Sequence, residues 1–428
     1  MSISATGSKR AWRTAVLGGM ASYMDAATII STGTALVLYK DHLGLSSWTI
    51  GFLSAMLTLG LGIGALLGGR LGDLLGRRRV FTYDLVVFAA GLALLAFAVN
   101  SWMLCIGVAV TGLAMGADIP TSLALVAEEA PEGRRSRMVA ASQALWSVGG
   151  FAAYLIGYLV SDLEVLGARI LYSHVLVVSL VVLVLRSRLG ESEEWRAAHA
   201  EQRHVPAAAE RGDSVRHLLA GPMGAAVIAL GLFYAIGNLA ANTFGQFQTY
   251  LFTEVAGAAV STATLVGMLA YPVGICAVLF YMRNVEGPAR MSIFTAGIVL
   301  MAGGAAVTLV FGLNLTTLVI LKLCVTIGSA FAGEIMFKVW AQEFFPTLLR
   351  GTAQGVVMAF TRLVSAGFAL VTPRILDVSH DALIAILLVG VLISGLVAWL
   401  WIVPLARARK QREDDAATLP ATAEAVAP

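Results

Sequence analysis

The chain has 428 residues, of which 58% are hydrophobic and only 13% are charged. A soluble domain carries about 25% charged residues, so this composition excludes a soluble protein and indicates an integral membrane protein. The formal net charge is +3, and because the basic residues are spread over many short segments, we expect no nucleic-acid partner.

Apolar segments long enough to cross a bilayer recur along the whole chain. A spanning helix needs about 20 residues, most of them apolar. Twelve segments meet this requirement and predict an all-α membrane protein with twelve transmembrane helices. They cover residues 14–39, 49–69, 80–99, 102–127, 137–161, 165–186, 221–251, 259–282, 291–313, 316–342, 352–373 and 380–405.

A polar stretch divides these segments into two sets of six. We expect a first six-helix half at residues 1–187, a cytoplasmic linker at 188–220, and a second six-helix half at 221–405. The tail at 406–428 is rich in Ala, Asp and Glu and is expected to be disordered. The first apolar segment is too long for a cleaved signal peptide, so we expect it to be retained as a spanning helix.

Charges at the ends of the spans predict the orientation. Most of the 29 Lys and Arg residues lie in segments that share one side of the membrane, and basic loops face the cytoplasm. We therefore expect both termini in the cytoplasm and the chain in a bacterial inner membrane. Cys105, Cys276 and Cys324 lie within spans without metal-binding spacing, so no disulfide, metal or other cofactor is expected.

The motif Glu-x-x-Pro-x-x-x-Arg occurs twice, 215 residues apart, which is about half the chain. Each copy ends one apolar segment and opens the next. A junction repeated at half the length indicates duplication, and two parallel halves of membrane helices are typical of a transporter with a substrate path between them. The copies consist of Glu128, Pro131 and Arg135, and of Glu343, Pro346 and Arg350.

The loop after the second span carries a further motif, Gly-Arg-Leu-Gly-Asp-Leu-Leu-Gly-Arg-Arg-Arg, at residues 69–79. With this loop the chain resembles the major facilitator superfamily, whose signature Gly-x-Leu-x-Asp-x-x-Gly-Arg-Arg it matches. The resemblance implies a fold of two six-helix bundles. The second half keeps only a remnant of the signature, with Asn284 and Gly287 at the places of Asp and Gly.

The repeated junction resembles that of the sugar-porter branch and of the related metabolite–proton symporters. Within the branch, Gly-Ala-Asp-Ile-Pro at 116–120 with Leu145-Trp146 is most similar to bacterial inositol permeases of the minor type. The resemblance and the fixed helix-end spacing imply ion pairs that gate the cytoplasmic side, and the alternative is a role in topology and solvation alone. The expected gate residues are Asp73, Arg77, Glu128, Arg135, Glu343 and Arg350.

Several ionisable residues lie inside the predicted spans, where charges are costly and usually functional. We expect Asp25, Asp118 and Glu334 to take part in proton coupling. Lys338 and Arg362 are the expected partners of Glu334. The resemblance places an aspartate of sugar–proton symporters at the position of Asp25. The alternatives are a carboxylate satisfied by neighbouring hydroxyl groups at Asp25 and a structural ion network around the other two acids.

Polar side chains recur every four residues along one face of the seventh span. Amide and phenol groups on one helix face can form paired hydrogen bonds to substrate hydroxyl groups. A glutamine in the fifth span stands where sugar porters have a sugar-contacting glutamine. Hydrogen bonding from helix to helix is the alternative for these amides. The expected substrate-binding residues are Gln143, Tyr234, Asn238, Asn242, Gln246, Gln248 and Lys338.

Glycines at positions 60, 62, 64 and 68 of the second span follow no predicted strand. The Gly64-x-x-x-Gly68 spacing in an apolar span predicts close contact between helices rather than nucleotide binding. The sequence contains no P-loop and no catalytic or metal-binding cluster. We therefore expect neither ATP drive nor an enzyme.

Together these features predict a secondary active transporter that takes up a neutral polyol or sugar, such as an inositol, with protons. Amides dominate the expected site, and the first half has no Lys or Arg at membrane depth, which disfavours an organic acid. We expect a monomer in the lipid bilayer whose partners are the substrate and protons. The alternatives are an exporter of drugs or metabolites, an organic-acid–proton symporter, and a non-transporting nutrient sensor.

Overall fold

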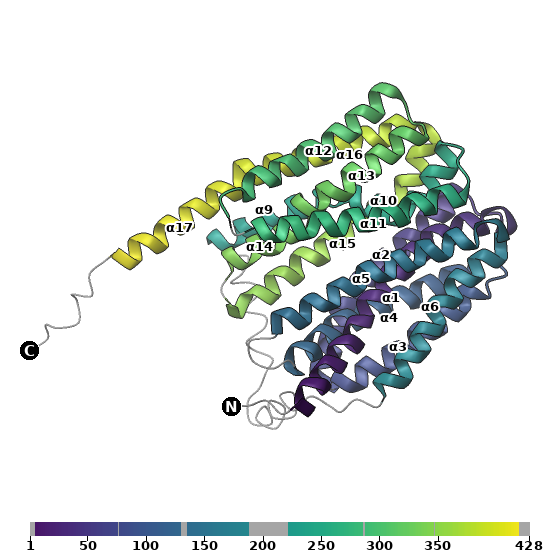
Figure 1. Cartoon of the computed structure of the whole chain (residues 1–428), viewed down its shortest axis with the longest axis horizontal. Coiled ribbons are helices and arrows are strands. Elements are labelled where there is room, and N and C mark those ends of the chain that lie inside the picture. Colours follow the sequence, from purple (N-terminus) through teal and green to yellow (C-terminus); the bar gives the residue numbers. More distant parts are fainter. Residues whose placement is uncertain are drawn as a thin grey trace, which may run out of the picture.

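The computed structural model describes the chain as an assembly of helices. Within the described ranges every regular element is helical. Figure 1 shows two bundles, one coloured purple to blue and the other teal to yellow, which lie side by side. The described residues are 5–75, 77–129, 135–187, 221–285, 287–345 and 347–418.

Six long helices form the first half. α1 packs mainly against α5, α2 against α4, and α3 against α4 and α6. The start of α1 and the end of α6 lie at the same end of the bundle (Figure 1), which we call the linker end. The helices are α1 (Ala5–Leu43), α2 (Ser47–Leu75), α3 (Arg77–Ala96), α4 (Ser101–Glu129), α5 (Arg135–Leu159) and α6 (Glu164–Arg186), with a short 3₁₀ turn, η1 (Ser161–Leu163), before α6.

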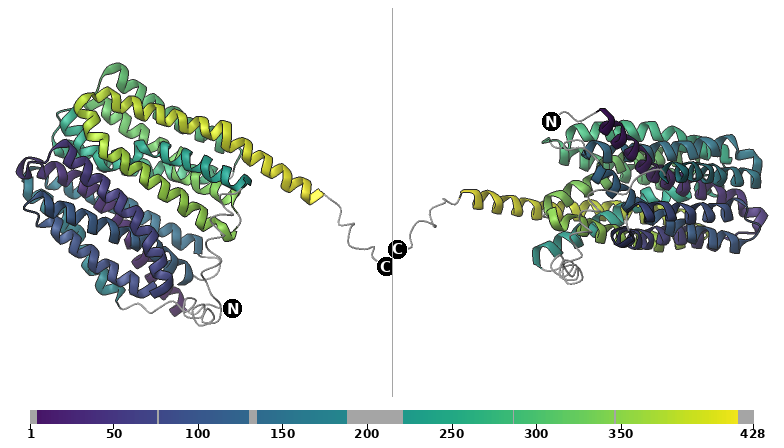
Figure 2. Two further views of the ribbon diagram at one scale, coloured as in Figure 1. Left: turned by 180° about the vertical axis from the view of Figure 1, so that it is seen from behind. Right: turned by 90° about the horizontal axis from the view of Figure 1, so that it is seen from below.

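The second half has the same number of spans, but some of them are interrupted. The elements in chain order are α9 (Gly221–Gly237), α10 (Leu239–Tyr250), η3 (Leu251–Val255), α11 (Val260–Asn284), α12 (Arg290–Phe311), α13 (Leu315–Ala332), α14 (Glu334–Phe344), α15 (Thr347–Val378), α16 (His380–Val397), η4 (Ala398–Ile402) and α17 (Val403–Thr418). The further views in Figure 2 show that the two halves are roughly parallel along their full length.

Helices occupy all twelve predicted spans. In the described part of the chain, nine helices or helix series are long and apolar enough to cross a membrane. The other three predicted spans correspond to α1, α3 and α5. The predicted all-α architecture with twelve spanning segments is confirmed.

Two predicted spans are interrupted. In the seventh, Asn238 separates α9 from α10, although backbone hydrogen bonds from Asn238 to Tyr234 and from Asn242 to Asn238 continue across it, and the span ends in the π-helical turn η3. The tenth breaks at Gly333, between α13 and α14. A Cβ at Gly333 would press on the backbone oxygen of Ser329, so glycine permits this break. Neither interruption can be recognised from hydropathy, which stays high on both sides of each.

The chain also stays helical beyond the twelfth span. α16 continues through η4 into α17, which ends at Thr418, whereas the sequence predicted disorder from residue 406. Ala, Arg, Lys, Gln and Glu dominate this segment and are strong helix formers. A hydrogen bond from Arg409 to the backbone oxygen of Phe344 also ties α17 to α14.

The two halves meet through contacts that the duplication relates to one another. The contact of α2 with α15 corresponds to that of α11 with α5, and α1 contacts α10 of the duplicated seventh span. The hydroxyl oxygens of Thr34 on α1 and Thr249 on α10 are 2.9 Å apart, and these residues have the same 215-residue offset as the repeated motif. A Cβ on Gly33 would collide with the backbone oxygen of Gln246, so glycine allows this approach. A pseudo-twofold axis therefore passes between α1 and α10.

The halves are joined at the end away from the linker. Lys40 Nζ donates a hydrogen bond of 2.6 Å to Glu254, and Ser47 donates one of 2.8 Å to Asp377. These two contacts join the end of α1 to η3 and the start of α2 to α15. We call the three contacts the latch: Thr34–Thr249, Lys40–Glu254 and Ser47–Asp377.

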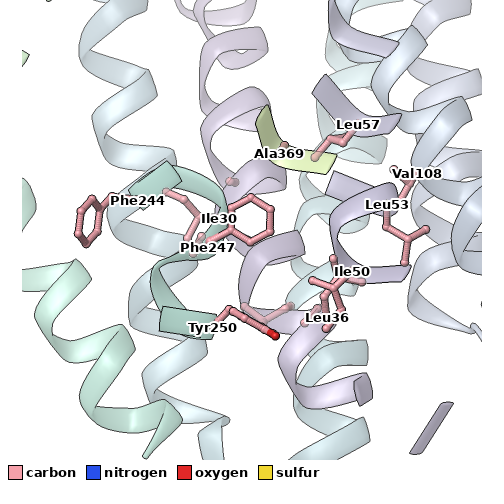
Figure 3. Packing of buried hydrophobic residues seen from close by; sticks show 14 of the residues in the cluster. Ile30, Leu36, Ile50, Leu53, Leu57, Val108, Phe244, Phe247, Tyr250 and Ala369 are labelled. Carbon is pink, nitrogen blue, oxygen red and sulfur yellow. The ribbon is translucent and has the colours of Figure 1, made fainter. Parts of the chain in front are cut away.

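Apolar side chains from both halves fill the space beside the latch. Figure 3 shows Ile30 and Leu36 of α1 close to Phe247 and Tyr250 of α10, with Ala369 of α15 nearby. All five are buried. Because one apolar cluster contains residues of both halves, the hydrophobic effect adds to the polar latch.

Close packing of α2 on α4 depends on two glycines. A Cβ on Gly64 would meet the backbone oxygen of Leu113, and one on Gly68 would meet Ala117. The contact that the Gly-x-x-x-Gly spacing predicted is confirmed.

We expect Gly64→Leu to destabilise the protein, because the added side chain must push α2 away from α4. Overpacking typically costs about 1–3 kcal/mol. Gly303→Leu in α12 is the matched control, since nothing lies within 4 Å of a Cβ at that position. Thermal unfolding of the purified variants measures the difference, and equal unfolding temperatures would contradict the contact.

Candidate functional site

The Asp25 carboxylate is buried where α1 faces the second half. Its Oδ2 accepts a hydrogen bond of 3.1 Å from Nε1 of Trp146 on α5. Its Oδ1 has no hydrogen-bond partner among the described residues. The charges that act on it most strongly are Arg362 of α15 and Glu334 of α14. One carboxylate oxygen of Asp25 is therefore open to a proton or to a substrate hydroxyl group.

Glu334 is the first residue of α14, directly after the break in the tenth span. Lys338 donates to it over 2.7 Å, and both side chains are 41% exposed although they belong to a spanning segment. The Tyr234 side chain lies close to Glu334, and its ring stacks on Phe337 at a centroid distance of 4.7 Å. A helix N-terminus stabilises a carboxylate at this position.

Arg362 of α15 connects the acids of the two halves. Its side-chain stem lies against Gly62 of α2, and its charge acts on both Asp25 and Glu334. Together with Lys338, the two cations balance the two carboxylates. Compensated charges can persist inside an apolar bundle, where a single unpaired charge would be costly.

The predicted stripe on the seventh span is divided by the break in that span. Asn238 occupies the break itself, and Tyr234 lies before it on α9. Asn242 and Gln246 stay together on α10, where Gln246 Nε2 donates to Asn242 Oδ1 over 3.2 Å and to the hydroxyl of Thr58 over 2.8 Å. Gln246 Oε1 is buried and has no partner among the described residues. It is thus an available acceptor for a hydroxyl donor.

Gln248 points away from this face. Its Oε1 accepts a hydrogen bond of 3.0 Å from the hydroxyl of Tyr154, and its Nε2 donates one of 2.7 Å to the backbone oxygen of Ala263. Two residues along an α-helix correspond to a rotation of about 200°, so Gln246 and Gln248 do not share a face. In this conformation Gln248 joins α10 to α5 and α11, which differs from the substrate contact that the sequence predicted.

Aromatic side chains line the site on the side of α5 and α11. The ring centroids of Trp146 and Tyr271 are 6.2 Å apart, and those of Tyr154 and Tyr271 are 6.0 Å apart. Trp146 is 38% exposed while its N–H group holds Asp25. The rings offer a large apolar contact area with defined polar tips.

The sequence did not identify Trp146, Tyr271 or Thr58 as site residues. A tryptophan in the middle of a span is a usable signal, because its indole N–H needs an acceptor and hydrocarbon supplies none. Thr58 gave no signal, since threonines are common in membrane helices and bond to their own backbone. Thr58 indeed also donates to the backbone oxygen of Ser54.

Asp118 belongs to a different group of charges from Asp25 and Glu334. Its Oδ1 accepts hydrogen bonds of 2.7 Å from Arg186 and 2.5 Å from Ser122. The Arg186 side chain is fully buried. This corrects the expectation that the first half has no basic residue at depth. The sequence placed Arg186 at the edge of the linker, but it is the last residue of α6 and its long side chain turns back into the bundle.

The predicted gate lies at the linker end. Glu343, at the end of α14, forms an ion pair with Arg290 at the start of α12. The other predicted gate residues lie on helices near this end, but their side chains fall outside the described residues. They are Asp73, Arg77, Glu128, Arg135 and Arg350. The side chain of Gln143, a predicted substrate contact, also falls outside the described residues.

Known proteins match the chain over most of its length. The sequence profile of the Major Facilitator Superfamily covers residues 15–370. The minor myo-inositol transporter IolF of Bacillus subtilis is 30% identical over 395 residues, which cover 91% of this chain and 90% of that protein. The glucose transporter GlcP of Staphylococcus epidermidis is 34% identical over 179 residues, or 42% of this chain and 39% of that protein.

Solved structures share the fold. The crystal structure of a D-xylose-proton symporter has a TM-score of 0.74 at 21% identity and covers 91% of this chain and 96% of its own. A partially occluded, inward-open structure of the xylose transporter XylE from E. coli has a TM-score of 0.73 at 18% identity, with coverages of 92% and 97%. The profile and the full-length relative show that the chain belongs to the major facilitator superfamily, in its sugar-porter branch, which is a family of transporters and not of enzymes.

Proposed function

We propose that the protein takes up a neutral polyol or sugar of the inositol type together with protons, by alternating access in a bacterial inner membrane. The observation that carries this proposal is the charge-balanced group between the halves, in which Asp25 and Gln246 each keep an unpartnered oxygen. Relatives that are named as transporters of myo-inositol and glucose support the substrate class. Both termini and the linker lie in the cytoplasm.

A neutral substrate with several hydroxyl groups suits the chemistry of the site. Asn242, Gln246 and Thr58 form a connected set of groups that both donate and accept hydrogen bonds. Trp146 and Tyr271 add apolar contact area. The charged side chains already compensate one another, so a carboxylate substrate would add an unmatched negative charge.

Asp25 is the proposed proton site. When ionised, it is attracted across the site to Arg362, which also acts on Glu334. When protonated, it is neutral and loses that attraction. Because Asp25 belongs to the first half and Arg362 to the second, binding a proton weakens a force between the halves. Proton binding is thereby linked to the relative position of the halves.

The latch supplies the other element of alternating access. The halves are bonded together at the end away from the linker. With the linker in the cytoplasm, this is a conformation closed toward the outside. Opening outward requires the latch to separate while the predicted gate residues at the linker end come together.

Uptake of an organic acid is the second candidate, because Lys338 and Arg362 place two cations at the site. Each is balanced by a carboxylate. A carboxylate substrate would bind once a proton neutralises Asp25 or Glu334 and frees one cation. Competition by polyols and hexoses, together with uptake of a labelled carboxylate, separates this candidate from the first.

We expect labelled myo-inositol to accumulate in membrane vesicles when the outside is acidic, and to stop accumulating when a protonophore collapses the gradient. Asp25→Asn is expected to abolish accumulation but to keep downhill exchange, because an amide cannot carry the proton. Asp41→Asn, at an exposed position near the end of α1, is the matched control.

Two results would contradict these expectations. Full gradient-driven accumulation by the Asp25→Asn variant would remove Asp25 as the proton site. If no polyol or hexose competed, and a labelled carboxylate were carried instead, the organic-acid candidate would replace the first.

We expect Gln246→Ala to raise the KM for the substrate roughly three- to tenfold, because one hydrogen bond contributes about 0.5–1.5 kcal/mol. Gln248→Ala is the contrasting variant. Its amide is bonded within the protein, so the change is expected to lower the unfolding temperature and to leave KM nearly unchanged. Initial-rate measurements with both variants test this, and the reverse pattern would show that Gln248 contacts the substrate.

We expect a disulfide between Thr34→Cys and Thr249→Cys to lock the latch. The hydroxyl oxygens are 2.9 Å apart, so the two side chains already point at each other, as the side chains of a disulfide must. In a background without Cys105, Cys276 and Cys324, oxidation should stop transport and reduction should restore it. Each single variant serves as a control. Unimpaired transport by the cross-linked protein would show that this contact does not open during the cycle.

A further inference from the structure

A second group of charges lies inside the first half, separate from Asp25. Arg186 of α6 donates over 2.7 Å to Asp118 of α4, over 3.1 and 3.0 Å to the backbone oxygen of Leu17, and over 3.4 Å to the hydroxyl of Ser122. Ser122 itself donates to Asp118 over 2.5 Å. Arg186 and Asp118 therefore form an enclosed, well-satisfied pair.

Asp84 of α3 is the third member of the group. It is only 8% exposed, and neither of its carboxylate oxygens has a hydrogen-bond partner among the described residues. Asp84 and Asp118 line the same small cavity, and Asp84 interacts electrostatically with both Asp118 and Arg186. The other residues that line the cavity are apolar: Ala21, Met24, Leu85, Phe88, Ala114 and Met115.

The charges of this group do not balance when both acids are ionised. Among the described residues, two carboxylates lie near one guanidinium, and Arg186 is also hydrogen-bonded to the neutral Ser122 hydroxyl and to the Leu17 carbonyl. An isolated buried charge is costly, whereas a neutral carboxylic acid is tolerated. One proton on the pair of acids restores neutrality, and Arg186 stabilises whichever carboxylate is ionised.

We propose that Asp84 and Asp118 together bind one proton, which is carried by the acid that Arg186 does not hold. In the described conformation Arg186 holds Asp118, so Asp84 carries the proton. A shift of Arg186 toward Asp84 would stabilise the ionised form of Asp84 and release that proton to water. The group is a second protonatable site, built from α3, α4 and α6 of the first half alone.

The importance of this site for transport rests on the proton coupling proposed above, but the bound proton itself does not. Infrared difference spectroscopy of the purified full-length protein in lipid detects the carbonyl stretch of a protonated carboxyl group without any substrate. An Asp25→Asn background removes the contribution of the central acid. In that background, we expect Asp84→Asn to remove one protonated-carboxyl band.

Two further variants sharpen the test. Asp118→Asn is expected to remove the same band, because Arg186 then pairs with Asp84 and keeps it ionised. The combination of Asp84→Asn and Asp118→Asn removes both of these acids from the buried Arg186, whereas each single variant keeps one of them. We therefore expect its unfolding temperature to fall by more than the sum of the falls in the single variants.

The proposal is overturned if Asp84→Asn leaves the infrared spectrum unchanged, since Asp84 would then be ionised in the native protein. It is also overturned if the band survives in Asp118→Asn, or if the double variant is no less stable than the singles predict. Loss of the band in Asp84→Asn with no effect on proton-driven accumulation supports the bound proton and rejects only its link to transport. Failure of inositol uptake in the native protein bears on the proposed substrate and leaves these outcomes unaffected.

Discussion

Gly33 of α1 lies directly against the backbone oxygen of Gln246 in α10, and the position of the halves relative to each other depends on this contact. It brings Thr34 to its duplicated counterpart Thr249 at the pseudo-twofold axis. Once α1 and α10 touch there, Gln246 of the second half reaches Thr58 of the first. The same approach closes the latch and lets one apolar cluster extend across both halves.

Charge compensation explains the arrangement of the polar groups inside the bundle. In the centre, Asp25 and Glu334 are balanced by Lys338 and Arg362, and the members come from both halves. Such a group responds when the halves move. The group around Arg186 contains two acids and one base and belongs to the first half alone, so it responds when helices shift within that half. The two groups thus have different partners in any conformational change.

The two halves have the same order of spans but differ in the spans that carry the polar side chains of the site. In the second half the seventh and tenth spans break at Asn238 and Gly333, and the broken ends carry Tyr234 and Glu334. Irregular backbone at membrane depth is tolerated where it lines a polar space between helices. The corresponding first and fourth spans, α1 and α4, are continuous. Asp25 therefore belongs to a continuous helix, whereas Tyr234 and Glu334 lie beside the interruptions of the second half.

Hydropathy, repeated motifs and glycine spacing are local properties of the chain, so they predict the number and order of the spans, the duplication and the close contact at Gly64. Packing determines that Arg186 turns inward to Asp118, 68 residues away, and that Gln248 bonds to Tyr154 and Ala263 instead of sharing the face of Gln246. A side chain at the end of a helix, or on a helix with polar residues on several faces, can point in several directions whose surroundings suit it equally well. Which one it takes depends on partners brought close only by packing, and spacing along the chain does not encode them.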